Sequence, residues 1–283
     1  MSRRVAMVTG ASRGIGKATS LALAEKGFDL VLAARTVTGS EVHEYSPRKD
    51  HSLERSMPGT LEETASLVRA RGREARVVRL DLLDRKSVVA AADAALAAFG
   101  HVDLLVNNAI YQGPGIMDRV LDVELGSAEK IFLGNVIHQL LLVQRLLPPM
   151  LERKDGAIVN LVSAAGMGDP PAPPESGGWG FVYGASKAAL IRMAGSLAVE
   201  HRDSGVGFFG VEPGLILTES MRVLGLDEQL AKNFGGAPPE VPAAVIAWLA
   251  TDPAAQEWHG KTLHAQEVAL RRGLVPDWRR KKP

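Results

Sequence analysis

Apolar and polar positions follow one repeating unit along most of the chain: a helical stretch, a glycine, then a short apolar run. Glycine suits the left-handed conformation just past a helix end, and continuous apolar runs are typical of strands covered on both faces. The pattern predicts helices over residues 18–26, 60–71, 87–99, 133–153 and 183–202. It predicts strands over residues 5–8, 28–32, 75–80, 102–106, 157–161 and 206–211, with 262–264 as a seventh.

Strands that alternate with helices favour right-handed crossovers and a parallel sheet between two helical layers. We therefore expect an α/β fold: a single doubly wound Rossmann-type domain over residues 1–283, with about seven parallel strands and helices on both faces. Three stretches interrupt the pattern. Residues 38–59 indicate a polar insertion, residues 166–180 a proline- and glycine-rich loop, and residues 215–237 a short amphipathic helix that could close over substrate as a lid.

Composition narrows the classes of function. The chain has 283 residues, 46% hydrophobic and 23% charged, which is typical of a soluble globular protein. It has no cysteine, which excludes disulfides and thiolate chemistry and is compatible with a cytoplasmic location. A net charge of +1 gives no indication of nucleic-acid binding. No uninterrupted apolar run approaches the ~20 residues of a membrane span, we find no signal peptide, and the scattered histidines predict no metal site.

A glycine-rich turn follows the first predicted strand and precedes the first helix. It reads Thr9-Gly10-Ala11-Ser12-Arg13-Gly14-Ile15-Gly16. Glycines let backbone N–H groups approach a pyrophosphate, and a helix N-terminus favours its negative charge. The position at the first strand-to-helix crossing therefore predicts dinucleotide binding by Gly10, Ser12, Arg13, Gly14, Ile15 and Gly16. The alternative is a tight turn that binds nothing.

The end of the second strand bears on the choice of dinucleotide. An acidic residue there accepts the ribose hydroxyls of NAD, whereas arginine suits the 2′-phosphate of NADP. This strand ends Ala33-Ala34-Arg35-Thr36, with no acid, and Arg13 adds a second cation on the same side. We expect NADP(H) to be preferred, with NAD(H) as the other candidate. Arg35 as a solvated charge is the plainer alternative, and Arg48 and Lys49 of the insertion would either add to the site or be solvated.

Further motifs follow in order along the α/β pattern. They are Asp81 after the third strand, Asn107-Asn108-Ala109 after the fourth, Asn135 in the next helix, Ser163 after the fifth, Tyr183-x-x-x-Lys187, and Pro213-Gly214 with Thr218. With the glycine turn, this ordered set resembles the classical short-chain dehydrogenase/reductase family over residues 4–268. The resemblance implies a nucleotide-binding oxidoreductase.

The residue types of the implied catalytic set suit hydride chemistry. A carbonyl that receives a hydride needs a proton, which Tyr183 can donate. A free phenol has a pKa of about 10, and Lys187 at i+4 shares its helix face, so we expect the ammonium charge to lower that pKa. Ser163 would hydrogen-bond the reacting oxygen. By resemblance, Asn135 would hold a water that links Lys187 to solvent.

The resemblance also assigns the cofactor contacts. Asp81, Leu82, Asn107 and Ala109 would lie on the adenosine side, and Tyr183 and Lys187 near the nicotinamide ribose. Pro213, Gly214, Ile216 and Thr218 would line the nicotinamide carboxamide. Three features depart from the family pattern: Ile110 replaces a glycine, Ala265-Gln266-Glu267 replaces a glycine pair, and Ser163 and Tyr183 stand 20 positions apart. The last departure requires the loop over residues 168–180 to bulge outward.

Three classes of function follow. The first is an NADP(H)-dependent oxidoreductase that transfers a hydride between nicotinamide and a carbonyl or secondary alcohol. The second is a β-ketoacyl thioester reductase, which a basic patch would favour (Arg119, Lys130, Arg192 and Arg222 are candidates). The third is a non-catalytic NADP-sensing protein. We expect a small-molecule partner, and a homodimer or homotetramer through helices 133–153 and 183–202. Candidate substrate contacts, mostly apolar, are Tyr111, Gln112, Ala165, Met167, Trp179, Phe181, Met221, Leu224 and Leu230.

Overall fold

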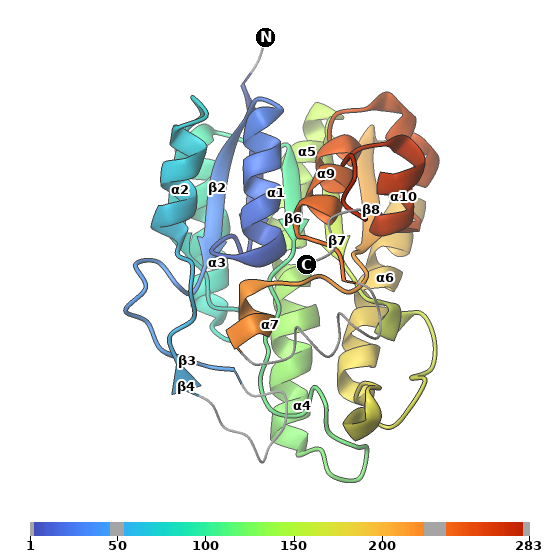
Figure 1. Cartoon of the computed structure of the whole chain (residues 1–283). Coiled ribbons are helices and arrows are strands. Elements are labelled where there is room, and N and C mark those ends of the chain that lie inside the picture. The colour runs from blue at the N-terminus through green and yellow to red at the C-terminus, as the bar shows by residue number, and fades with distance from the viewer. Residues whose placement is uncertain (1–2, 46–53, 224–235, 280–283) are drawn as a thin grey trace.

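The centre of the fold is a seven-stranded parallel sheet in the order β5-β2-β1-β6-β7-β8-β9 (Figure 1). The structure is a computed structural model that describes residues 3–45, 54–223 and 236–279. The predicted parallel sheet of about seven strands is confirmed, the short seventh strand included. The strands are β1 (Arg4–Thr9), β2 (Phe28–Ala34), β5 (Ala75–Arg79), β6 (Leu104–Asn107), β7 (Gly156–Leu161), β8 (Val206–Glu212) and β9 (Thr262–His264).

Neighbouring residues of each strand serve two separate apolar layers. In β1, Ala6 and Val8 belong to one buried cluster, and Val5 and Met7 belong to the other. Both faces of the sheet are therefore covered, which is why the strands read as continuous apolar runs. One layer holds α1 (Gly14–Glu25), α2 (Leu61–Arg69), α9 (Glu240–Leu249) and α10 (Ala265–Arg272); the other holds α3 (Arg85–Phe99), α5 (His138–Arg153) and α6 (Phe181–Glu200).

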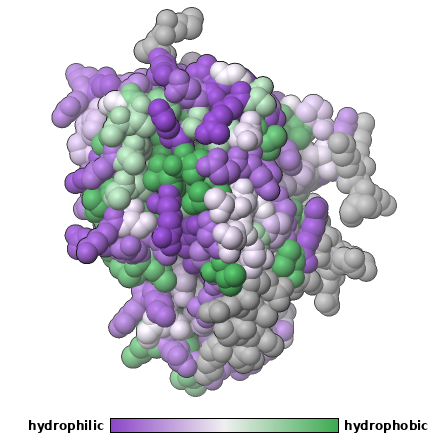
Figure 2. Space-filling view, turned by 90° about the vertical axis from the view of Figure 1, so that its left-hand side faces the viewer, coloured by the Kyte–Doolittle hydropathy of each residue, from purple (hydrophilic) through white to green (hydrophobic). Residues whose placement is uncertain are grey.

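The edge strand β5 is protected by charge. Arg76 and Arg79 are exposed on it, and charged side chains at a sheet edge hinder pairing with another chain. The face of the molecule that Figure 2 presents is mainly hydrophilic, with a limited apolar area near its centre.

The described part of the insertion over residues 38–59 contains a turn and a short strand pair, where its polarity predicts a loop. It opens with a turn in which the Glu41 carboxylate accepts backbone N–H bonds from Val37 (2.8 Å), Thr38 (3.1 Å) and Gly39 (2.7 Å). These bonds lower the pKa of Glu41 to about 2. A short antiparallel pair follows, β3 (His43–Glu44) with β4 (Glu54–Arg55). Arg48 and Lys49 lie outside the described residues.

The loop between Ser163 and Tyr183 projects to the side of α6, as the spacing requires (Figure 1). Close backbone contacts fix both of its ends. A Cβ on Gly166 would lie 2.5 Å from the nitrogen of Ala188, and one on Gly184 would lie 2.7 Å from the carbonyl oxygen of Ala165. The loop itself contains two 3₁₀ turns, η2 (Ala164–Gly166) and η3 (Pro174–Ser176).

One continuous helical run covers Leu125–Arg153. It consists of α4 (Leu125–Phe132), a π-helical turn η1 (Leu133–Ile137) and α5. By length and hydropathy this run alone among the described helices could cross a membrane, although the sequence suggests no such segment. Half of its most apolar window is buried within the fold, however, where α5 contributes to the core beside α3. A single helix of this kind is weak evidence for a membrane span.

The stretch over residues 215–237 is described only in part. Ile216 forms an isolated bridge with Ala237, and α7 (Glu219–Val223) is a short helix at the carboxyl edge of the sheet (Figure 1). Leu224 and Leu230, candidates for substrate contacts, lie outside the described residues.

Candidate active site

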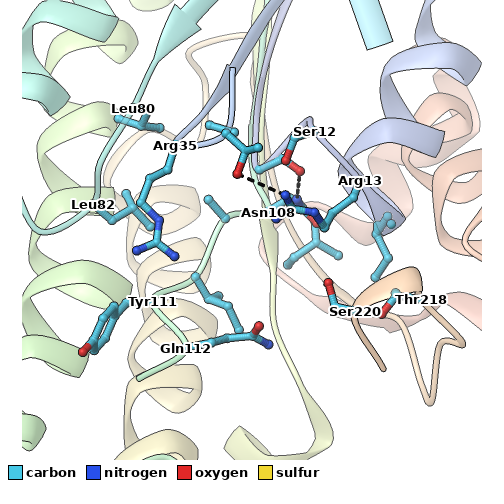
Figure 3. Close-up of a pocket in the computed structure, with 18 of the residues that line it drawn as sticks. Ser12, Arg13, Arg35, Leu80, Leu82, Asn108, Tyr111, Gln112, Thr218 and Ser220 are labelled. Carbon is cyan, nitrogen blue, oxygen red and sulfur yellow. Dashed lines mark hydrogen bonds between the residues drawn. The ribbon is translucent and has the colours of Figure 1, made fainter. Parts of the chain in front are cut away.

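A cavity of about 270 Å³ lies where the carboxyl ends of the strands meet (Figure 3). Figure 3 shows Thr218 and Ser220 on one side of it, Tyr111 and Gln112 on the other, and Arg35 extending into it. The cavity joins the glycine turn to Tyr183 and Lys187. Its lining is Gly10, Ser12, Arg13, Gly14, Ile15, Ala34, Arg35, Thr36, Tyr45, Leu80, Asp81, Leu82, Leu83, Asn108, Ala109, Ile110, Tyr111, Gln112, Leu161, Val162, Tyr183, Lys187, Pro213, Thr218 and Ser220.

The glycine turn has the tight geometry that its sequence predicts. Gly10 has a φ of 68°, and a Cβ on Gly16 would lie 2.2 Å from the carbonyl oxygen of Gly10, so a side chain is excluded there. The amide of Asn108 donates to the carbonyl of Thr9 (2.8 Å) and ties this turn to the end of β6.

Helix α1 begins at Gly14 without a side-chain cap on its first backbone N–H groups. Gly14 N instead donates to Glu219 Oε2 of α7 at 3.0 Å. An uncapped helix N-terminus that already attracts a carboxylate fits an anionic pyrophosphate, so these residues suit a dinucleotide.

The end of β2 presents arginine but no carboxylate to the cavity. Arg35, Thr36 and Tyr45 line it together with Asp81, whose Oδ1 accepts the backbone N–H of Leu83 (2.9 Å). Arg13 is engaged by the protein: it donates to Tyr45 Oη at 2.8 Å and Thr36 Oγ1 at 3.0 Å.

Tyr183 and Lys187 lie one turn apart on α6, and both line the cavity. Lys187 Nζ donates to the carbonyl of Leu161 (2.7 Å), and burial lowers the pKa of Lys187 to about 7. Burial raises the pKa of Tyr183; a hydrogen bond with Ser163 lowers it and the charge of Glu212 raises it further. Our expectation that Lys187 lowers the pKa of Tyr183 is therefore not met in this structure, since burial dominates the phenol and disfavours a charged lysine.

Ser163 and Asn135 support the site from outside the cavity lining. Ser163 lowers the pKa of Tyr183 and also caps η2, since its Oγ accepts the backbone N–H of Ala165 (3.2 Å). Asn135 is fully buried in the π-helical turn η1, and its Oδ1 accepts the backbone N–H of Tyr111 (2.6 Å). π-Helical turns are frequent at functional sites, and here the turn fixes the loop that carries Tyr111.

Most of the predicted cofactor residues lie around this cavity, and four do not line it. Gly16 packs behind the turn, and Ile216 is buried in the bridge with Ala237. Asn107 donates to Asn160 Oδ1 of β7 (3.0 Å) rather than facing the cavity. Gly214 has a φ of 75° and packs against Gln266, whose amide donates to the carbonyls of Pro213 and Leu215 (3.2 Å each).

The candidate substrate contacts separate into two groups. Tyr111 and Gln112 line the first cavity, whereas Ala165, Met167, Trp179 and Phe181 line a second one of about 840 Å³. This second cavity lies on the other side of α6 because its α6 residues, Phe181, Gly184, Ala185 and Ala188, occupy a different helix face from Tyr183 and Lys187. Met221 lines neither cavity.

Sequence reasoning passed over several residues of the site. Asn108 stands in a motif that the sequence did identify, and Ser220 lies two positions after Thr218. Tyr45 comes from the insertion and Glu212 from the end of β8, and no local motif marks either residue.

Comparisons with known proteins agree with this geometry. A family model described as short chain dehydrogenase matches residues 4–52 and 49–229. The chain is 31% identical over 268 residues to a 3-oxoacyl-acyl-carrier-protein reductase of Synechocystis sp., covering 93% of this chain and 96% of that protein. A reductase of the same name from Staphylococcus epidermidis is 29% identical over 266 residues, with 92% and 96% covered.

A solved structure supports the same assignment. It is a short-chain type dehydrogenase/reductase from Mycobacterium marinum, with a TM-score of 0.74 at 25% identity over 93% of this chain and 94% of that one. The family resemblance is confirmed. The chain belongs to the short-chain dehydrogenase/reductase family and is an oxidoreductase that acts on CH–OH and C=O groups.

Proposed function

We propose that the protein is an NADP(H)-dependent oxidoreductase that interconverts an apolar ketone or aldehyde and the corresponding alcohol. One observation carries the proposal: the glycine turn, Arg35 and the pair Tyr183–Lys187 line a single cavity. The absence of an acidic side chain at the end of β2 supports NADP(H) over NAD(H).

When bound, the dinucleotide supplies or accepts the hydride. In the reducing direction Tyr183 donates its phenolic proton to the substrate oxygen, and its raised pKa keeps that proton in place at neutral pH. Ser163, whose hydroxyl lowers the pKa of Tyr183, orients the same oxygen. Lys187 is buried beside the site and exchanges its proton near neutral pH. Asn135 holds the Tyr111 loop that forms the opposite wall.

A β-ketoacyl thioester is the second candidate substrate, because two relatives carry the name 3-oxoacyl-acyl-carrier-protein reductase. All four basic residues that would favour it, Arg119, Lys130, Arg192 and Arg222, are exposed, and Arg119 is paired with Glu175. The mostly apolar substrate side of the first cavity, with Ile110 and Val162, favours the simpler carbonyl.

The test is spectrophotometric. NADPH and NADH consumption is followed with a panel of apolar ketones and an acetoacetyl thioester, for the native protein and Tyr183→Phe. We expect NADPH turnover with ketones and a loss of at least about a hundredfold in Tyr183→Phe, since general acid catalysis contributes about 10²–10⁴. Equal rates in both proteins contradict the role of Tyr183. Dinucleotide binding without turnover of any substrate favours an NADP sensor.

We also propose a cytoplasmic homo-oligomer that pairs through α5 and α6. Large apolar side chains are exposed at both ends of α6 (Phe181 and Val199) and just before α5 (Ile137). Light scattering coupled to size exclusion measures the mass, and a monomer at micromolar concentration contradicts this assembly.

A further inference from the structure

The insertion is fastened directly to the glycine turn. Arg13 Nε donates to the carbonyl of Pro58 (2.8 Å), and its Nη2 donates to that of Gly59 (3.2 Å). A Cβ on Gly59 would lie 2.5 Å from the carbonyl oxygen of Ser12, so the two backbones are in close contact. With its bonds to Tyr45 and Thr36, all three nitrogens of the Arg13 guanidinium are committed to acceptors of the protein.

Arg35 differs from Arg13 in this respect. Within the described part of the chain, its guanidinium has no hydrogen bond or ion pair to a protein group, and it extends into the cavity (Figure 3). Among the described residues its one ring contact is with Tyr45, whose centroid lies 5.7 Å from Arg35 Cζ, and its charge also acts on His43 and Tyr111. Arg13 Cζ lies 5.9 Å from the same ring. Tyr45 is 7% exposed and lines the same cavity as both arginines.

We propose that Tyr45 is a positioning residue that holds Arg35 for the 2′-phosphate of the dinucleotide, while Arg13 is the tether that holds Tyr45. The inference rests on the proposed preference for NADP(H). An aromatic face attracts a guanidinium and limits its rotamers, so a free arginine is preorganised for a bidentate contact with phosphate. An exposed arginine without such a platform loses more entropy on binding.

Arg13 and Arg35 therefore have different roles, although the sequence predicts that both bind the 2′-phosphate. One cation binds the phosphate, and the other joins the turn to a segment far along the chain. The insertion then acts in cofactor selection because it supplies the platform for the phosphate-binding arginine.

The experiment uses two fragments of the cofactor, adenosine 2′,5′-bisphosphate and AMP, with the full-length protein in a calorimeter. The readout is the ratio of their dissociation constants, which isolates the 2′-phosphate. We expect the native protein to prefer the bisphosphate by about 10–100-fold, as a charge-assisted contact provides. Arg35→Ala removes most of this ratio. Tyr45→Leu lowers it by about fivefold or more, and Tyr45→Phe, which retains the ring but loses the hydrogen bond from Arg13, lowers it less than Tyr45→Leu does.

Two further variants separate positioning from simple damage. Tyr45→Leu in the Arg35→Ala background should lower the ratio no further, because the residue acts through Arg35. Arg13→Lys keeps the charge but cannot serve several acceptors at once, so it should lower the ratio as Tyr45→Leu does. Arg79→Ala, which removes an exposed arginine from β5, is the matched control and should leave the ratio unchanged. Circular dichroism checks that each variant is folded.

The outcomes test the NADP(H) preference separately from the roles of Tyr45 and Arg13. A native protein that binds both fragments equally contradicts the NADP(H) preference and this inference together. A native protein that prefers the bisphosphate, with a ratio retained in Tyr45→Leu or in Arg13→Lys, leaves the preference standing and overturns the assignment of Tyr45 and Arg13. An additive effect of Tyr45→Leu in the Arg35→Ala background overturns it as well.

Discussion

Glu212 is the carboxylate whose charge acts on the catalytic phenol. It is 8% exposed, its Oε1 accepts the N–H of Gly214 (2.8 Å), and its Oε2 lies 3.1 Å from His264 Nδ1. Its negative charge disfavours the phenolate and raises the pKa of Tyr183. Glutamine at this position keeps an acceptor for Gly214 and removes the charge.

We therefore expect Glu212→Gln to lower the pKa of Tyr183. Alcohol oxidation needs the phenolate, so its kcat/KM rises with pH through that pKa, and the rising limb should move to lower pH in the variant. The falling limb of ketone reduction should move in the same direction. The pH–rate profiles measure this, with Glu257→Gln, an exposed carboxylate paired with Arg272, as the control. Coincident profiles of the native protein and Glu212→Gln contradict the coupling.

Lys187 illustrates a conflict between stability and function at one residue. Burial lowers its pKa from 10.5 to about 7, so between these values the unfolded chain binds a proton that the folded chain does not. The free energy of unfolding therefore rises with pH over this range. At pH 7 and below, the burial of Lys187 destabilises the folded protein to its full extent.

Lys187→Met should thus raise the free energy of unfolding of the cofactor-free protein at pH 7 by a few kcal/mol, on the order expected of a shift of several pKa units. The gain should shrink as pH rises toward 10.5, and turnover should be lost. Urea unfolding at pH 7 and pH 9.5 measures the difference. A variant that is less stable at pH 7, or a gain independent of pH, would show that the lysine is not buried as an unfavourable cation.

Sequence motifs predicted those site residues whose partners lie close to them in the sequence. Tyr183 and Lys187 could be predicted because the i, i+4 spacing places both on one helix face, and the glycine turn because its strand and helix are adjacent in sequence. Tyr45 and Glu212 could not. Tyr45 lies at the cavity, where Arg13 contacts both it and the far end of the insertion, and such contacts leave no pattern in the sequence.

At the scale of elements, a contact between α7 and α1 occupies the helix end that we propose for the pyrophosphate. The Glu219 carboxylate accepts the N–H of Gly14, at the helix end where a pyrophosphate would bind. A carboxylate at a helix N-terminus contributes about 0.3–1 kcal/mol, and a bound phosphate has to displace it.

Glu219→Gln should therefore tighten NADPH binding by about threefold or more, since removing the carboxylate weakens the competing contact and ends its repulsion of the phosphates. The dissociation constant from tryptophan fluorescence measures this effect, and high salt should diminish it. Glu240→Gln, an exposed acid in the first turn of α9, is the control. Unchanged or weaker binding in Glu219→Gln would mean that this contact does not oppose the cofactor.

Element prediction succeeded where periodicity and helix ends agree. The α3 helix has an Asp84 cap and ends at Gly100 with a φ of 80°, close to its predicted bounds. The helices α4, α9 and α10 were not predicted. The α9 helix is buried on nearly all sides, so its sequence shows no apolar stripe. The β3–β4 pair spans only two residues on each strand, too few for an alternating pattern.

At the scale of the whole molecule, the sequence pattern predicted the number of strands and their parallel direction. It did not predict their order in the sheet. Alternating strands and helices fix right-handed crossovers, but they do not state where the chain reverses its direction across the sheet. In the structure β1 lies between β2 and β6, and the cavity opens at this reversal. Ligands of open α/β sheets bind at such a point, so the topology agrees with the proposed dinucleotide site.

The two apolar layers share every central strand, and this makes a prediction about unfolding. Val5 and Met7 face one layer while Ala6 and Val8 face the other, so neither layer can separate without exposing the other. We expect a single cooperative thermal transition, as for one domain. NADPH at a hundred times its dissociation constant should add about 2.7 kcal/mol and raise the midpoint by several degrees, and NADH at the same concentration should raise it less. Differential scanning calorimetry measures both effects. Two resolved transitions, of which NADPH shifts only one, would mean that the helical layers unfold independently and that the cavity belongs to one of them.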